Sequence, residues 1–170
     1  MLDSVNMKAT VSKEEFKKQS KLLKRELETL PQKIKAAKIP VIILFEGWGA
    51  AGKGSIISDL ILNFDPRGFK VYSTAEATET EKRHPLLWRH WQNLPEQGYM
   101  SILDRSWYQD VSIARVEDDL SDSETLHRMN SINTFERQLT DNGYLVLKFF
   151  LHIGQKEQRA RFEKLESDKN

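Results

Sequence analysis

The residues with the clearest chemistry in this chain are Gly47 to Lys53, which read G-W-G-A-A-G-K and match the G-x-x-x-x-G-K pattern of a phosphate-binding loop. The apolar run PVIILFE before them predicts a buried strand, and apolar positions at helical spacing after them predict a helix. Glycines let successive backbone N–H groups converge on phosphate oxygens, and the lysine adds a positive charge. The alternative is a glycine-rich turn that binds nothing. We expect phosphate binding by Gly47, Gly49, Ala50, Ala51, Gly52, Lys53, Gly54 and Ser55.

The usual metal anchor of such a loop is missing, because Gly54 stands where serine or threonine normally holds magnesium. The stretch SILDRSWY offers another ligand, since its Asp104 ends an apolar strand at the edge where an α/β sheet places its ligand crevice. A carboxylate there can hold Mg²⁺ against phosphates, and Arg105 would point into the same crevice. The alternatives are a helix N-cap for Asp104, unless Ser106 takes that place, and a salt bridge at the rim for Arg105. We predict Lys53, Asp104 and Arg105 as catalytic residues, with Asp104 as the metal ligand.

Strand and helix patterns alternate along the chain, which predicts an α/β fold. Strands are expected at residues 40–46, 69–73, 99–104 and 144–153. Helices are expected after the glycine loop, through most of residues 79–98, over residues 121–143 and from residue 155. This order predicts a P-loop NTPase-like three-layer sandwich, in which helices flank a mostly parallel sheet and the crossovers are right-handed.

The first forty residues carry a separate helical pattern. Ser12 and Glu15 have capping-box spacing, and Pro31 is expected to mark a break or a restart. The helix should dock on the body through an apolar stripe of Phe16, Leu23, Leu27, Leu30 and Ile34. We therefore divide the chain into an N-terminal helical extension packed on the core, residues 1–38, and a P-loop kinase-like domain, residues 39–170, which is expected to continue beyond its last residue.

Composition narrows the class of protein. Charged residues make up 30% and hydrophobic ones 39% of 170 residues, as in globular domains. The net charge of +1 argues against a dedicated nucleic-acid-binding protein, and the lack of cysteine excludes disulfides and thiolate chemistry. The longest apolar run is too short to cross a bilayer, and the N-terminus has no secretory signal pattern. We expect a cytoplasmic protein that binds neither nucleic acid nor membrane.

Together these motifs resemble the type-2 polyphosphate kinase family, which includes the polyphosphate:AMP phosphotransferases. The likeness covers most of the chain, in LFEGWGAAGKGS, DPRGFKVYS, EKRHPLLWRHW, DRSWYQDVSIARVE and FERQLTDNGYLVLKFFLHIGQKEQRARF. It implies a fold like that of thymidylate kinase, and phosphoryl transfer between inorganic polyphosphate and a nucleoside mono- or diphosphate (AMP/ADP type) with Mg²⁺. In this family the G-K-G-S ending of the loop is normal. The resemblance implies phosphate contacts by Lys53 and Arg105, metal binding by Asp104, and a place for Arg115 along the polyanion path.

The chain departs from the family pattern at three positions. Gly49 stands where the family usually has an aspartate that helps to bind metal, Asp110 where it has an arginine, and Ala114 where it has a glutamate. Two acidic groups and one basic group are thus absent from the expected site. Losing one such group commonly costs on the order of a hundredfold in rate. Glu46 and Glu76 are the carboxylates that could substitute.

Three functions remain open on the sequence. The first is a polyphosphate-dependent nucleotide phosphotransferase, and the second is a degenerate, non-catalytic polyphosphate- or nucleotide-binding domain of a tandem family member. The third is an ATP-dependent nucleoside monophosphate kinase, against which the G-K-G-S loop and the D-R-S-W-Y motif argue. The resemblance also implies a homo-oligomer or a tandem second domain as partner. Lys82 and Arg83 would form a basic entrance or a solvated helix face.

Overall fold

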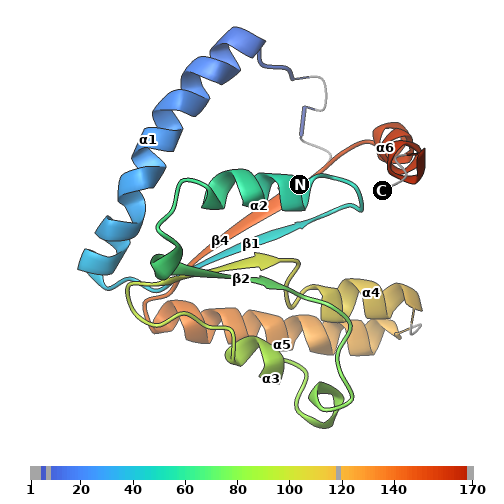
Figure 1. The fold of residues 1–170 in the computed structure, drawn as a ribbon. Coiled ribbons are helices and arrows are strands. Elements are labelled where there is room, and N and C mark those ends of the chain that lie inside the picture. Colours follow the sequence, from blue (N-terminus) through green and yellow to red (C-terminus); the bar gives the residue numbers. More distant parts are fainter. Residues whose placement is uncertain (1–4, 7–8, 118–119, 168–170) are drawn as a thin grey trace.

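The computed structural model describes residues 5–6, 9–117 and 120–167, and Figure 1 shows their arrangement. Its helices are α1 (Lys13–Ala37), α2 (Lys53–Ile61), α3 (Trp88–Trp91), α4 (Gln109–Glu117), α5 (Asp122–Asp141) and α6 (Gln155–Ser167). Its strands are β1 (Val41–Gly47), β2 (Phe69–Ser73), β3 (Met100–Asp104) and β4 (Leu145–Leu151). Short 3₁₀ helices occupy Pro66–Gly68 and Glu81–Arg83.

The four strands form one parallel sheet in the order β2-β3-β1-β4, as the alternating pattern predicts. The central strand β1 is buried on both faces, because successive side chains of a strand point to opposite sides. Ile42 and Leu44 pack with α4 and α5, whereas Val41, Ile43 and Phe45 pack with α2 on the other face. The three-layer α/β sandwich is therefore confirmed, with helices on both sides of the sheet (Figure 1).

Helix α1 begins at the predicted cap, but it differs from its prediction in two other ways. It begins after Ser12, whose side chain accepts a hydrogen bond from the Glu15 N–H, and it runs through Pro31 without the predicted break. Pro31 is buried, and only Leu27 and Ile34 of the apolar stripe pack against the core. The expectation that the whole stripe docks is wrong, because the first half of α1 rises away from α2 (Figure 1) and leaves Phe16 (65%) and Leu23 (57%) exposed. Leu30, in the second half of the helix, is also exposed (39%).

The segment 79–98 is not the mostly helical one that we predicted. It holds only a 3₁₀ turn and the four-residue α3. Pro85 explains the interruption, since a residue before proline is pushed out of the helical region and His84 is extended, with φ −109° and ψ 165°. By contrast, α5 has the predicted capping box at Ser121 and Glu124. Among the described residues no helix combines the length and apolarity that a membrane crossing needs.

Candidate functional site

The loop between β1 and α2 has the backbone geometry that a phosphate cradle requires. Gly47 and Gly52 have φ values of 134° and 96°, and Ala50 between them has a φ of 57°. A Cβ atom at Gly47 would lie 2.3 Å from the carbonyl oxygen of Leu151, so no other residue fits where β1 and β4 approach. The strand, loop and helix predicted around the motif are thus present.

Lys53 is the first residue of α2 and lies inside the loop. Its side chain donates hydrogen bonds from Nζ to the carbonyl oxygens of Gly47, at 3.0 Å, and Trp48, at 3.1 Å. The residue is 9% exposed, so its charge acts where water screens it poorly. Gly54 and Ser55 follow at the exposed start of α2, where a helix favours anions.

Asp104 ends β3 on the strand next to the loop. Its register partner on β1 is Phe45, two residues before the loop begins. Its Oδ1 atom is buried and has no hydrogen-bond partner among the described residues. The N-cap alternative does not hold, because α4 begins only at Gln109. A buried carboxylate oxygen without a partner is costly, and a water molecule, a metal ion or a ligand can satisfy it.

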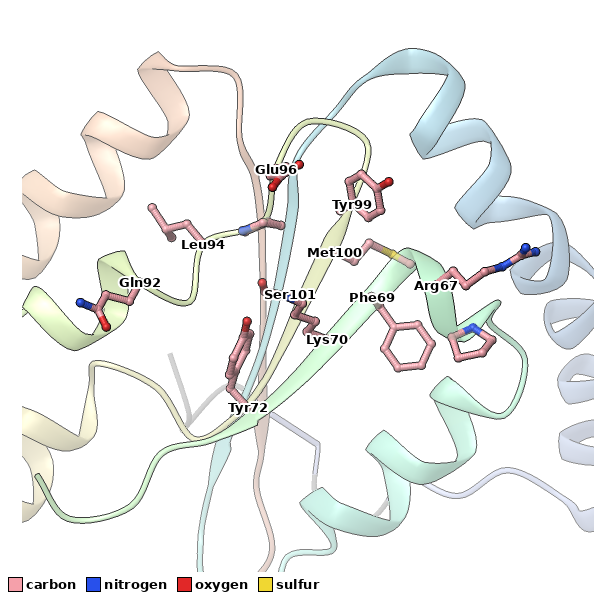
Figure 2. Close-up of a pocket in the computed structure, with 12 residues that line it drawn as sticks. Arg67, Phe69, Lys70, Tyr72, Gln92, Leu94, Glu96, Tyr99, Met100 and Ser101 are labelled. Atoms are coloured by element: carbon pink, nitrogen blue, oxygen red, sulfur yellow. The ribbon is translucent and has the colours of Figure 1, made fainter. Parts of the chain in front are cut away.

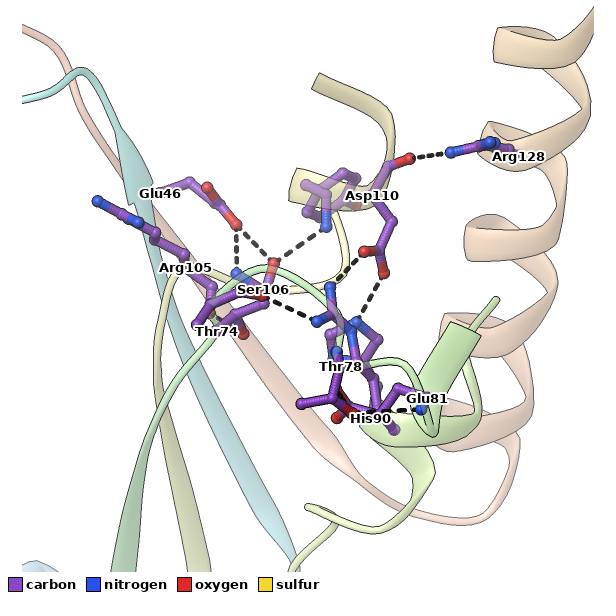
Figure 3. A network of polar contacts seen from close by, with 12 residues as sticks. Glu46, Thr74, Thr78, Glu81, His90, Arg105, Ser106, Asp110 and Arg128 are labelled. Carbon is purple, nitrogen blue, oxygen red and sulfur yellow. Dashed lines mark hydrogen bonds and ion pairs between the residues drawn. The ribbon is translucent and has the colours of Figure 1, made fainter. Parts of the chain in front are cut away.

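Arg105 follows in a left-handed conformation, with a φ of 64°. It is exposed, and no side-chain partner occurs for it in the described ranges, so the salt bridge at the rim is not seen there. Figure 3 shows the guanidinium extending away from Ser106 and from the Asp110 network. Its predicted phosphate contact stays a prediction.

Glu46 brings a second carboxylate to the same edge of the sheet. Its Oε1 accepts hydrogen bonds from Ser106, at 2.8 Å from the backbone nitrogen and 2.6 Å from Oγ (Figure 3). Burial raises the pKa of Glu46 above its ordinary value of 4.5, although the Ser106 hydrogen bonds and the charges of Lys53 and Arg105 oppose that rise. The other suggested substitute, Glu76, is 91% exposed and lies 3.7 Å from the Lys82 ammonium.

These carboxylates fit a magnesium ion better than a transition metal. Within the described part of the chain, no three His, Cys, Asp or Glu side chains gather into a metal-binding group. Mg²⁺ does not need such a cage, since it is commonly held by one or two carboxylates, substrate phosphates and water. Asp104, with its unpartnered oxygen, is one such carboxylate, and Glu46 lies on the adjacent strand β1 at the same edge of the sheet.

Helix α6 covers the loop, a contact that sequence reasoning missed. Gln158 donates to the carbonyl oxygen of Gly49 at 3.0 Å, and Arg161 donates to those of Ala50 and Ala51 at 3.2 Å. A Cβ atom at Gly49 would lie 2.9 Å from the ring of Phe162. The sequence predicted only that a helix starts at residue 155, which says nothing of this contact.

The other two departures from the family pattern lie on α4. Asp110 pairs with Arg89 and His90, whereas Ala114 is buried on the core-facing side of the helix. Arg115 of the same helix donates to the carbonyl oxygen of Leu120 and pairs with Asp122 at 2.5 Å. Arg115 would have to release these partners to reach a phosphate, and its place on the polyanion path stays a prediction.

A large cavity elsewhere does not belong to this site. It measures about 590 Å³ and lies beside the amino-terminal halves of β2 and β3, with Phe69, Lys70, Met100 and Ser101 in its wall (Figure 2). Parallel α/β sheets bind ligands outside the carboxyl ends of their strands. The loop, Asp104 and Glu46 all lie at that carboxyl edge, at the opposite end from this cavity.

Comparison with known proteins agrees with the geometry. The family model described as Polyphosphate kinase 2 (PPK2) matches residues 10–169. The chain is 35% identical over 166 residues to a polyphosphate:AMP phosphotransferase of Pseudomonas syringae pv. tomato, covering 98% of this chain and 33% of the relative. It is 36% identical over 134 residues to an ADP-polyphosphate phosphotransferase of Rhodopseudomonas palustris, covering 72% of this chain and 46% of the relative.

Two solved structures have the same fold. The crystal structure of polyphosphate kinase 2 from Arthrobacter aurescens superposes with a TM-score of 0.91 and 29% identity, over 99% of this chain and 63% of that one. A putative polyphosphate kinase 2 from Pseudomonas aeruginosa gives a TM-score of 0.92 and 33% identity, over 99% and 36% of the two chains. The chain therefore spans about a third of the length of the Pseudomonas proteins it matches.

Proposed function

This chain belongs to the polyphosphate kinase 2 family, and from that premise we propose that it transfers a phosphoryl group between inorganic polyphosphate and a nucleoside mono- or diphosphate. The observation that carries the proposal is Asp104, whose unpartnered, buried Oδ1 lies on the strand next to the phosphate-binding loop. Relatives with names that specify AMP or ADP and polyphosphate support this substrate class.

In the proposed reaction the loop amides and Lys53 hold the anionic phosphate chain at the start of α2. The bond between the terminal phosphorus of polyphosphate and its bridging oxygen breaks, and a bond to an oxygen of the acceptor phosphate forms. The shortened polyphosphate keeps the bridging oxygen. Catalysis of such a transfer is mostly positioning and neutralisation of charge, which Lys53 and the exposed Arg105 would provide.

We assign the magnesium site of this reaction to Asp104, with Glu46 as a second carboxylate. Bound Mg²⁺ would neutralise the charge of the phosphate oxygens that approach these groups. Lys53 must then exchange its hydrogen bonds to the carbonyl oxygens of Gly47 and Trp48 for phosphate oxygens. Because Lys53 lies inside the loop already, that exchange needs only a small movement of its side chain.

A second candidate function is a non-catalytic polyphosphate- or nucleotide-binding domain that supports an active partner. Two contacts favour it: Phe162 fills the space beside Gly49, and Asp110 pairs with Arg89 where the family pattern has a basic residue. In either case we propose that the chain works as a homo-oligomer or beside a second domain. The edge strand β4, which leaves Leu147, Phe149 and Phe150 between 37% and 49% exposed, supports such a partner.

One assay separates the two functions. The protein is incubated with long-chain polyphosphate, Mg²⁺ and AMP or ADP, and the formation of ADP or ATP is measured. The phosphotransferase proposal predicts turnover that Lys53→Ala lowers by about a hundredfold or more. Polyphosphate binding without turnover would instead establish the non-catalytic domain. Turnover with ATP as the sole competent donor would contradict both.

A further inference from the structure

An open cavity of about 440 Å³ lies beyond the carboxyl ends of β2 and β3, apart from the glycine loop. Segment 77–89, α4 and α5 form its walls, and its ionisable lining includes Glu81, Lys82, His84, Arg89, Asp110 and Arg128. The segment before it is tied to the catalytic edge, because the Thr74 hydroxyl donates to the carbonyl oxygen of Arg105 at 3.1 Å. The cavity is therefore placed to hold a group that reacts at that edge.

Asp110 is the centre of the polar contacts in this wall (Figure 3). Its carboxylate accepts hydrogen bonds from Arg89 and, at 2.8 Å, contacts Nε2 of His90. Its backbone carbonyl accepts a hydrogen bond from Arg128 of α5 at 2.7 Å. Arg89 also donates to the carbonyl oxygen of Ala75 at 2.9 Å, so Asp110 and Ala75 hold its guanidinium in place.

Burial strengthens the electrostatic interactions of the Arg89–Asp110 pair. The side chains of Arg89 and Asp110 are each 11% exposed, and that of His90 is 2% exposed. Two charges in such surroundings interact more strongly than at the surface, and they also act more strongly on a ligand beside them. Asp110 therefore cancels much of the attraction that Arg89 would otherwise exert on an anion in the cavity.

We propose that Asp110 is a built-in counter-ion that sets how strongly this cavity takes the phosphate end of the acceptor nucleotide. The inference rests on the proposed function for the identity of the ligand. Asp110 acts through Arg89, and its negative charge disfavours each additional negative charge on the acceptor. Asp110 accordingly lowers the cavity's preference for a nucleoside diphosphate over a monophosphate, because the diphosphate brings more negative charge toward the same carboxylate.

The test measures binding of AMP and of ADP by isothermal titration calorimetry, without polyphosphate. Asp110→Asn keeps the shape of the side chain and an oxygen that can accept from Arg89, but it removes the charge. We expect the affinity for ADP to rise about tenfold, and that for AMP to rise less. The matched control is Asp65→Asn, which removes an aspartate paired with Arg67 at 2.7 Å, outside the cavity, and should leave both affinities unchanged.

Thermal unfolding separates this role from a merely structural one. Asp110→Asn weakens a buried ion pair, so its melting temperature should fall while its nucleotide affinity rises. A structural role would lower both. If Asp110→Asn does not fold, Arg128→Gln, on the partly exposed face of α5, removes a cation of the cavity and should weaken ADP binding about tenfold; unchanged ADP binding in that variant would overturn the proposal.

Equal affinities in the wild type and Asp110→Asn, or no nucleotide binding to either protein, would also overturn it. A gain as large in Asp65→Asn would mean that net charge alone decides the affinity. Failure of the proposed function is distinguishable, because it is read from polyphosphate-dependent turnover and its dependence on Lys53. The counter-ion can be established by calorimetry in a protein that turns nothing over.

Discussion

At the scale of single residues, the Glu46 carboxyl group links burial to pH. Its pKa is raised above 4.5, chiefly by burial. From pH 4.5 up to its folded pKa the folded state holds a proton that the unfolded state has lost. Stability therefore decreases as the pH rises through that window, and the penalty is complete above it. The group contributes most to folding when it is neutral.

This sign predicts the behaviour of Glu46→Gln, which keeps the acceptor for Ser106 and removes the charge. The melting temperature of the variant minus that of the wild type should be larger at pH 7 than at pH 4, when both proteins are measured in buffer with a chelator. Glu28→Gln, an exposed position on α1, serves as the control. A melting-temperature difference that does not change with pH, or that favours wild type more at pH 7, would show that burial does not dominate at Glu46.

Two glycines of the loop region should respond oppositely to alanine. Gly54 lies in α2 with no atom within 4 Å of an added Cβ, so Gly54→Ala should raise the free energy of unfolding by about 0.5–1 kcal/mol. Gly47→Ala would place its Cβ 2.3 Å from the Leu151 carbonyl oxygen at a φ of 134°, and should cost more than about 2 kcal/mol. Urea unfolding measures both, and equal effects at the two positions would contradict the loop geometry.

At the scale of elements, α6 limits the space that is available to a side chain at position 49. The family pattern has an aspartate there, but Phe162 lies 2.9 Å from the position of its Cβ. An aspartate must therefore displace the Phe162 ring, which is 43% exposed and can move. The absence of an aspartate at position 49 therefore goes together with the packing of Phe162 of α6 against the loop.

We accordingly expect Gly49→Asp alone to change the polyphosphate-dependent rate little, and to lower the melting temperature. In a Phe162→Ala background the aspartate has room, and the rate should rise about tenfold or more over Phe162→Ala alone. Initial rates of ADP formation from AMP measure both effects. Identical responses to the aspartate in the two backgrounds would mean that α6 does not control this position.

At the scale of the whole molecule, the sequence predicted what local patterns determine. The strands, the glycine turn and the α5 capping box follow from neighbouring residues, and the sheet follows from their order. Three features depend instead on contacts between distant residues. They are the exposed first half of α1, the non-helical parts of segment 79–98 and the packing of α6 on the loop. Asp104 could be proposed as a ligand from the sequence, but only the structure shows that its Oδ1 has no hydrogen-bond partner among the described residues.

The central claim is that the loop after β1, with Lys53, binds phosphate groups. Its most direct test is calorimetric titration of tripolyphosphate into the wild type and Lys53→Met, with the melting temperature of both recorded. A charge-assisted hydrogen bond contributes about 1.5–3 kcal/mol, so the variant should bind on the order of ten- to a hundredfold more weakly while remaining folded. Equal affinity of the two folded proteins for tripolyphosphate would contradict the account.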